Sequence, residues 1–193
     1  MRKIWANLLT STNVLLGMVA LFLTVQGEFQ LAAILVIVGM VIDGLDGWVA
    51  RALGTQSDFG RELDSLSDLL IFGVAPAVIL YVDDLRTLGW VGVAVAAMFP
   101  LAGALRLARF NTQTDHTNYF VGLPTTAAGG TLAAFSLYHG RLPGVLAPVL
   151  TVVLSYLMIS QTRYPNLKKI GMPRGTWRRV EKLRNLSTKK MKA

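Results

Sequence analysis

Residues 43–68, DGLDGWVARALGTQSDFGRELDSLSD, decide how the rest of this chain is arranged. They carry two pairs of aspartates, Asp43 with Asp46 and Asp64 with Asp68, spaced i,i+3 and i,i+4. Residues at these spacings share one face of a helix. Each pair adjoins a strongly apolar run, LAAILVIVGMVI before the first and LLIFGVAPAVILYV after the second. The stretch therefore predicts two apolar helices whose adjoining ends carry four carboxylates.

Four carboxylates beside apolar helices need a compensating positive charge. An aspartate at the centre of a bilayer costs about 2.5–3.5 kcal/mol, and facing carboxylates also repel one another. Mg²⁺ and Mn²⁺ are hard cations that prefer carboxylate oxygen. Two such ions, about 3.5–4 Å apart, can grip a pyrophosphate and neutralise a leaving phosphate. We therefore expect two divalent ions at Asp43, Asp46, Asp64 and Asp68; the alternative is a polar interfacial loop without metal.

The composition is that of an integral membrane protein. Of 193 residues, 53% are hydrophobic and only 16% are charged, and the mean hydropathy is +0.49. A soluble domain of this length is seldom so apolar. The absence of cysteine excludes disulfides and thiolate metal sites, and two histidines, His116 and His139, are too few and too scattered for a zinc site.

The apolar runs predict an all-α integral membrane fold with six transmembrane helices and an N-terminal interfacial helix at about residues 1–11. Since roughly 20 apolar residues cross a bilayer, the first, fifth and sixth runs need their polar flanks. Residues 1–162 would form one membrane catalytic domain, and residues 163–193 a basic cytoplasmic tail. The six runs are Thr12–Gln26, Phe29–Leu53, Glu62–Tyr81, Leu88–Phe110, Leu123–Tyr138 and Pro143–Ile159.

The charge distribution predicts the orientation in the membrane. Eleven Lys and Arg lie between Arg163 and Ala193 against one acid, Glu181, while the whole chain carries +8. Positive residues stay on the cytoplasmic side, so both termini and the aspartate loop should face the cytoplasm, in the cell membrane. The tail would bind anionic lipid headgroups or act only as a topogenic signal. We expect membrane lipids, and no nucleic acid, as partners.

The aspartate stretch also matches a known pattern, D-x2-D-G-x2-A-R-x8-G-x3-D-x3-D, at every fixed position. It resembles the signature of the CDP-alcohol phosphotransferase family. The resemblance implies an enzyme that displaces CMP from a CDP-linked substrate with an alcohol. It also implies that the four aspartates bind the metals and that Asp68 is the general base. The fixed positions are Asp43, Asp46, Gly47, Ala50, Arg51, Gly60, Asp64 and Asp68.

The residues between the two pairs suit a nucleotide. Gly47 and Ala50 remove side-chain bulk, and the planar fork of Arg51 can bind phosphate oxygens. Ser57 and Gly60 offer a hydroxyl and an open backbone. The resemblance implies binding of CDP-diacylglycerol by Asn13, Asp46, Gly47, Ala50, Arg51, Ser57 and Gly60.

Four further blocks resemble one branch of the family, the membrane-embedded phosphatidylserine synthases. They are RELDSLSDLLIFGVAP (61–76), ALRLARFN (104–111), FVGLPTTAAG (120–129) and YPNLKK (164–169). The resemblance implies transfer of a phosphatidyl group from CDP-diacylglycerol to L-serine with release of CMP. It also implies a homodimer.

The second of these blocks suits an amino-acid acceptor. Arg106 and Arg109 are spaced i,i+3, and an arginine fork fits the carboxylate of serine. The amide of Asn111 can accept from its ammonium, and Thr125 can line the pocket. Alternatively, the arginines only anchor the helix at the interface, and the threonine is filler.

Two rival functions remain open at this point. The same chemistry can use another alcohol, such as glycerol 3-phosphate or inositol phosphate. Intramembrane aspartates also occur in divalent-cation transporters, although the Gly–Ala–Arg pattern between the two pairs suits a nucleotide better.

Overall fold

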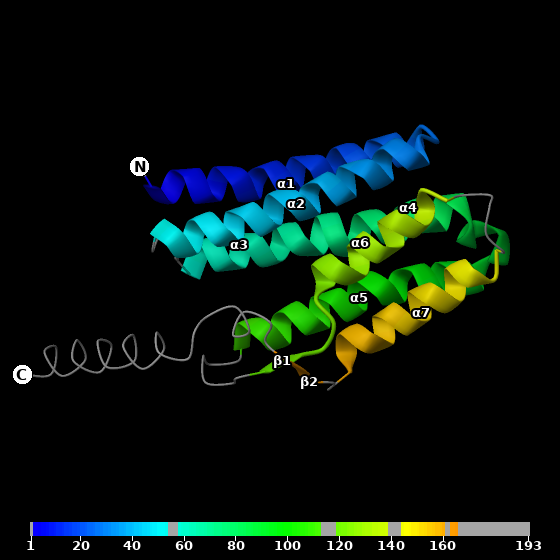
Figure 1. Cartoon of the computed structure of the whole chain (residues 1–193). Helices are drawn as coiled ribbons and strands as arrows, with labels where there is room; N and C mark the ends of the chain where they lie inside the picture. Colours follow the sequence, from blue (N-terminus) through cyan, green and yellow to red (C-terminus); the bar gives the residue numbers. More distant parts are fainter. Residues whose placement is uncertain (1, 54–57, 113–118, 139–143, 161–162, 166–193) are drawn as a thin grey trace, which may run out of the picture.

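A computed structural model describes residues 2–53, 58–112, 119–138, 144–160 and 163–165, with side chains described from Thr10 in the first helix and as far as Leu45 in the second. In this part of the chain the fold is a bundle of helices (Figure 1), as predicted. The α-helices are α1 (Arg2–Val25), α2 (Phe29–Leu53), α3 (Asp58–Asp68), α4 (Ala75–Asp83), α5 (Trp90–Thr112), α6 (Thr125–Ser136) and α7 (Leu146–Ile159).

Two helical stretches of the described residues are long and apolar enough to cross a membrane, Phe59–Asp83 and Trp90–Thr112. Three shorter apolar helices accompany them, Thr10–Val25, Phe29–Leu45 and Leu146–Ile159. The N-terminal segment expected as a separate interfacial helix is instead the beginning of α1, which continues to Val25. No proline or glycine interrupts residues 2–16, so the chain has no local reason to end a helix there.

The third predicted span is one continuous helix with a change of winding in the middle. Between α3 and α4 lies a π-helical segment, η1 (Leu69–Val74), where the Ala75 N–H donates to the Leu70 carbonyl. Pro76 follows in the first turn of α4. Because proline has no N–H to continue the α-helical ladder, a wider turn before it is a local solution. Such π-bulges are frequent at functional sites.

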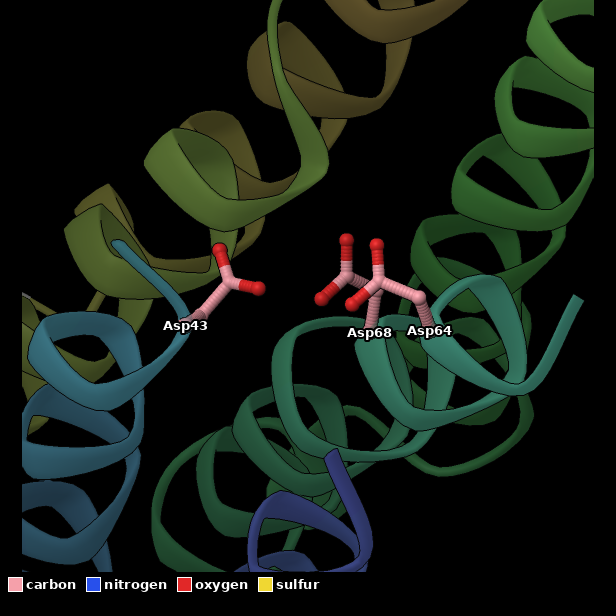
Figure 2. A group of neighbouring side chains, drawn as sticks. All are labelled: Asp43, Asp64 and Asp68. Atoms are coloured by element: carbon pink, nitrogen blue, oxygen red, sulfur yellow. The ribbon is translucent and has the colours of Figure 1, made fainter. Parts of the chain in front are cut away.

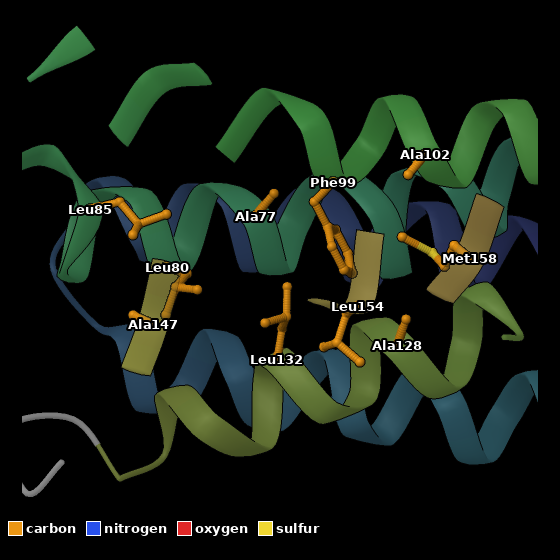
Figure 3. Close-up of a cluster of buried hydrophobic side chains, with 10 residues drawn as sticks. All are labelled: Ala77, Leu80, Leu85, Phe99, Ala102, Ala128, Leu132, Ala147, Leu154 and Met158. Carbon is orange, nitrogen blue, oxygen red and sulfur yellow. The ribbon is translucent and has the colours of Figure 1, made fainter. Parts of the chain in front are cut away.

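Two buried apolar clusters hold the bundle together. One, drawn in Figure 3, joins α4, α5, α6 and α7 around Phe99, Leu132 and Met158. The other joins α1 and α2 to η1 and α4 around Val36, Ile71 and Phe72. Helix α6 lies very close to η1 at Gly129, where a Cβ would collide with the Phe72 carbonyl. Small residues allow such contacts where lipid supplies no hydrophobic drive.

Short extended segments close one end of the bundle. Strand β1 (Tyr119–Val121) pairs antiparallel with β2 (Arg163–Pro165). Directly after β1, Gly122 has φ +82° and lies against the Met158 carbonyl, while the Leu123 N–H donates to the Leu157 carbonyl at 3.1 Å. We call β1, β2 and Gly122–Leu123 the clasp. It ties the start of α6 to the end of α7, and no pattern in the sequence predicts it. Elsewhere, outside the clasp, the 3-10 turn η2 (Leu85–Leu88) connects α4 to α5.

Candidate metal centre

Three of the four predicted metal ligands meet in space. One carboxylate oxygen from each of Asp43, Asp64 and Asp68 lies within 4.8 Å of the others. Figure 2 shows Asp43 on α2 facing Asp64 and Asp68, whose carboxylates lie side by side on α3. We call these three residues the acid cluster. The i,i+4 spacing on α3 places two acids on one face, and α2, which packs against η1 and α4, supplies the third.

The acid cluster fits a divalent cation by the chemistry of its donors. The Oδ1 atom of Asp68 is buried and has no hydrogen-bond partner among the described residues. Its charge interacts unfavourably with those of Asp43 and Asp64. Buried polar atoms are normally satisfied, and a carboxylate left without a partner is costly. Oxygen ligands from three carboxylates are what Mg²⁺ or Mn²⁺ prefers.

Asn13 lies one helical turn deeper than the acid cluster. Its side chain is 2% exposed, and its Oδ1 is buried without a hydrogen-bond partner among the described residues. The same oxygen lies 3.5 Å from where a Cβ on Gly39 would stand, with Ile71 also against that glycine. Gly39 lies one helical turn before Asp43, and Ile71 lies about one turn after Asp68. The Asn13 amide, which sits between them, is therefore about one turn further into the bundle than the carboxylates.

Arg106 and Thr125 form a second polar group facing Asp68. Arg106 Nη1 donates to Thr125 Oγ1 at 3.2 Å, and Thr125 is 1% exposed in the first turn of α6. The guanidinium and the Asp68 carboxylate attract each other electrostatically. Arg106 Nε is buried without a partner among the described residues. A buried donor of this kind, beside the acid cluster, can receive a carboxylate from a ligand.

The other two residues predicted to contact serine, Arg109 and Asn111, are hydrogen-bonded to neighbouring helices. Arg109 Nη1 donates to the Ile159 carbonyl at the end of α7 at 3.1 Å. Asn111 Nδ2 donates to Ser65 Oγ at 3.0 Å and to Glu62 Oε2 at 3.2 Å. Both protons of that amide nitrogen are therefore used within the protein.

The remaining predicted site residues precede α3 or begin it. Asp46, Gly47, Ala50 and Arg51 lie on the last turns of α2, but their side chains are outside the described part of the structure. Ser57 is also outside the described residues. Gly60 lies in the first turn of α3, four residues before Asp64.

Comparison with known proteins decides the family. The CDP-alcohol phosphatidyltransferase family matches residues 3–162, which contain the acid cluster, Asn13, Arg106 and Thr125. The chain belongs to the CDP-alcohol phosphatidyltransferase family. Membership confirms the resemblance drawn from the aspartate pattern, and with the apolar helices it identifies a membrane protein.

Several named relatives of this CDP-alcohol phosphatidyltransferase cover most of its length. The CDP-diacylglycerol–serine O-phosphatidyltransferase of Helicobacter pylori is 40% identical over 176 residues, covering 86% of this chain and 74% of that protein. The Bacillus subtilis enzyme of the same name is 36% identical over 162 residues, covering 84% and 90%. The archaetidylserine synthase of Methanothermobacter thermautotrophicus is 37% identical over 169 residues, covering 86% and 71%.

Sequence reasoning missed some polar residues beside the acid cluster of this family member. Ser65, Ser67 and Glu62 occupy variable positions of the family pattern, although all three lie in the 61–76 block that resembles one branch of the family. That block and the helical spacing of these residues from Asp64 were the available signals. Without the neighbouring helices, however, that spacing does not tell a hydroxyl that faces lipid or solvent from one that bonds to another helix.

Proposed function

We propose that this CDP-alcohol phosphatidyltransferase transfers the phosphatidyl group of CDP-diacylglycerol to L-serine and releases CMP, forming phosphatidylserine. The observation that carries the proposal is the acid cluster with Arg106 beside it, in a chain whose relatives from H. pylori and B. subtilis are named for that reaction.

We propose that Asp43, Asp46, Asp64 and Asp68 hold two divalent ions, Mg²⁺ or Mn²⁺. Bound there, such ions would supply positive charge to the pyrophosphate and to the departing phosphate. The buried, unpartnered Oδ1 of Asp68 supports a cation at this point. Asp46 joins the set on the strength of the family pattern.

Arg106 and Thr125 would orient serine for attack. The buried Nε of Arg106 is available for the serine carboxylate, while Nη1 stays bonded to Thr125. A single arginine fork matches one carboxylate, whereas a phosphate dianion would call for several converging cations. Arg109 and Asn111, bonded to α7 and α3, would frame this pocket from outside.

Asp68 would act as the base in the transfer. The serine hydroxyl oxygen forms a bond to the diacylglycerol-linked phosphorus, and the bond from that phosphorus to the CMP oxygen breaks. CMP leaves with the electron pair, and the serine proton goes to Asp68. The proximity of Asp68 to Arg106 supports this role, because a serine bound to the guanidinium would place its hydroxyl near that carboxylate.

The nucleotide would bind on the α2 side of the acid cluster. We propose contacts to CDP-diacylglycerol from Asp46, Gly47, Ala50, Arg51, Ser57 and Gly60. Asn13 supports this assignment from below, because its buried and unpartnered amide oxygen can accept from a ligand. The acyl chains would lie in the bilayer between the helices.

We further propose six transmembrane spans, with residues 1–162 forming the catalytic domain and residues 163–193 a basic tail on the cytoplasmic face of the cell membrane. Both termini and the active site would face the cytoplasm, and the enzyme would work as a homodimer. The Lys and Arg asymmetry supports the orientation. Cysteines placed at Asp83 or Gly140 should then react with an impermeant reagent in intact cells, and a cysteine at Ser57 should not. Outside labelling at Ser57 would reverse the topology.

The acceptor is tested with purified protein, CDP-diacylglycerol, Mn²⁺ or Mg²⁺, and a panel of labelled alcohols. We expect phosphatidylserine and CMP in equal amounts, and both should disappear on chelation of the metal. Transfer to glycerol 3-phosphate or inositol phosphate without use of serine would replace the acceptor and leave the metal site standing. Metal transport into proteoliposomes without any CMP release would favour a transporter.

A further inference from the structure

Helix α3 is held to its neighbours by polar side chains on two sides. On one side, the Asn111 amide of α5 donates from Nδ2 to Ser65 Oγ at 3.0 Å and to Glu62 Oε2 at 3.2 Å. The single proton of the Ser65 hydroxyl can go to the Arg61 carbonyl of its own helix at 3.1 Å or to Asn111 Oδ1 at 3.3 Å. On the other side, Ser67 Oγ donates to the Thr10 carbonyl of α1 at 3.2 Å. We call these two connections the serine ties.

The serine ties bracket the face that carries the two aspartates. At about 100° per residue, Asp64 and Asp68 lie within about 40° of each other around the axis of α3. Ser67 lies about 80° to one side of their mean direction and Ser65 about 80° to the other. A rotation of α3 that carried the aspartates away from Asp43 would have to break one tie or both.

Few side chains of α3 itself are buried. Of the side chains from Phe59 to Asp68, only that of Ser67 is fully buried, so apolar packing gives α3 few constraints. The next residues, Leu69–Val74, are π-helical. The π turn shifts the angular phase between α3 and the packed residues Ile71 and Phe72, whereas Ser65 and Ser67 are direct chain neighbours of Asp64 and Asp68.

We propose that Ser65 and Ser67 are positioning residues, whose hydrogen bonds to Asn111 and to the Thr10 carbonyl set the rotation of α3 and aim Asp64 and Asp68 at Asp43. This inference rests on the proposed metal site. It adds residues that the family pattern leaves variable, and it gives Asn111 a role that acts through Ser65 without contact with serine.

The test is binding of Mn²⁺ alone, measured by electron paramagnetic resonance on the full-length protein in lipid nanodiscs without substrate. Loss of one hydrogen bond should weaken Mn²⁺ binding by roughly threefold to tenfold in Ser65→Ala, Ser67→Ala and Asn111→Ala. Because Ser65 and Asn111 act as one unit, their double variant should be no weaker than the weaker single variant. Ser65→Thr, which keeps the hydroxyl, should recover most of the affinity.

Thr112→Ala is the matched control. Thr112 is next to Asn111, but its hydroxyl bonds to the carbonyls of Ala108 and Arg109 within its own helix, so Mn²⁺ binding should not change. The serine KM, measured with metal saturating, should change less than about twofold in Ser65→Ala and Asn111→Ala, because neither residue would touch the acceptor.

Three results would overturn the proposal. Wild-type Mn²⁺ affinity in Ser65→Ala, Ser67→Ala and Asn111→Ala, with loss in Asp64→Asn, would contradict the positioning role of the serine ties and leave the metal site intact. Wild-type affinity in Asp64→Asn would remove the metal site and the ties together. A raised serine KM in Asn111→Ala with unchanged Mn²⁺ binding would make Asn111 a direct acceptor contact.

Discussion

Two polar regions lie at the same end of the bundle, and their side chains are satisfied in different ways. In the acid cluster and its neighbour Arg106, Asp68 Oδ1 and Arg106 Nε are buried without partners among the described residues. In the clasp and its neighbour Arg109, the described contacts go to the backbone, to the Ile159 carbonyl at 3.1 Å and from Leu123 N–H to Leu157.

The difference separates groups that await a ligand from groups that hold the fold. An unsatisfied buried donor or acceptor costs stability, so its retention beside a cluster of carboxylates points to function. A guanidinium on the last carbonyls of a helix instead satisfies that helix and complements its dipole. Arg106 and Arg109 are three residues apart on α5, yet they belong to different regions.

The largest effect should come from removing a charge within the acid cluster. Asp43→Asn and Asp64→Asn should lower kcat/KM by at least about a hundredfold, since the site would lose charge where cations stabilise the transition state. Direct Mn²⁺ binding should weaken in parallel. Full activity in either variant would contradict the metal site.

Asp68→Asn should differ in kind from the other acid variants. If Asp68 is mainly the base, turnover should stop while CDP-diacylglycerol still binds to the purified protein. Binding of that lipid, measured by titration with metal saturating, checks the point. Equal loss of lipid binding in Asp68→Asn and Asp46→Asn would remove the distinct role of Asp68.

Arg106→Ala should have the next largest effect on activity. Loss of one charge-assisted hydrogen bond should lower kcat/KM for serine by about tenfold to a hundredfold, with CDP-diacylglycerol binding little changed. Arg106→Lys keeps the charge and should recover part of the loss. Wild-type serine kinetics in Arg106→Ala would exclude Arg106 from serine binding and leave it a structural role, as expected for Arg109.

Gly122→Ala tests the clasp by its backbone. The new Cβ would require a residue other than glycine at φ +82° and would collide with the Met158 carbonyl. We expect the melting temperature to fall by about 3–8 °C, with a smaller loss of kcat/KM for serine than in Arg106→Ala. Gly144→Ala, where a Cβ meets nothing within 4 Å, is the control.

Arg109→Ala should have the smallest effect. Removing its bond to the Ile159 carbonyl should lower the melting temperature by about 2–4 °C and change the serine KM by less than about threefold. A loss in serine kinetics equal to that of Arg106→Ala, without a change in melting temperature, would place both arginines in the acceptor pocket and end the distinction.

Much of the fold was accessible from local pattern. The second span was predicted at Phe29–Leu53, and α2 has these bounds. The fourth, fifth and sixth runs correspond to α5, α6 and α7 with ends shifted by at most three residues. Apolar periodicity and length define such helices. The clasp could not be predicted from the sequence, because Tyr119–Val121 and Arg163–Pro165 pair across more than forty residues. Neither segment has the local alternation that predicts a strand.

By itself, the sequence determined the chemistry available to this protein: a helical membrane chain, carboxylates at fixed helical spacing, and arginines on a later helix. These follow from residue type and from periodicity along one helix. The tertiary structure decided which of these groups meet. It brought Asp43 of α2 close to Asp64 and Asp68 of α3. It also directed Arg106 toward Thr125 and Arg109 toward α7, and it gave Ser65 and Ser67 hydrogen-bond partners on other helices. The reason is that two side chains one turn apart on a helix look equivalent in sequence, and only the packing of neighbouring helices gives them different partners.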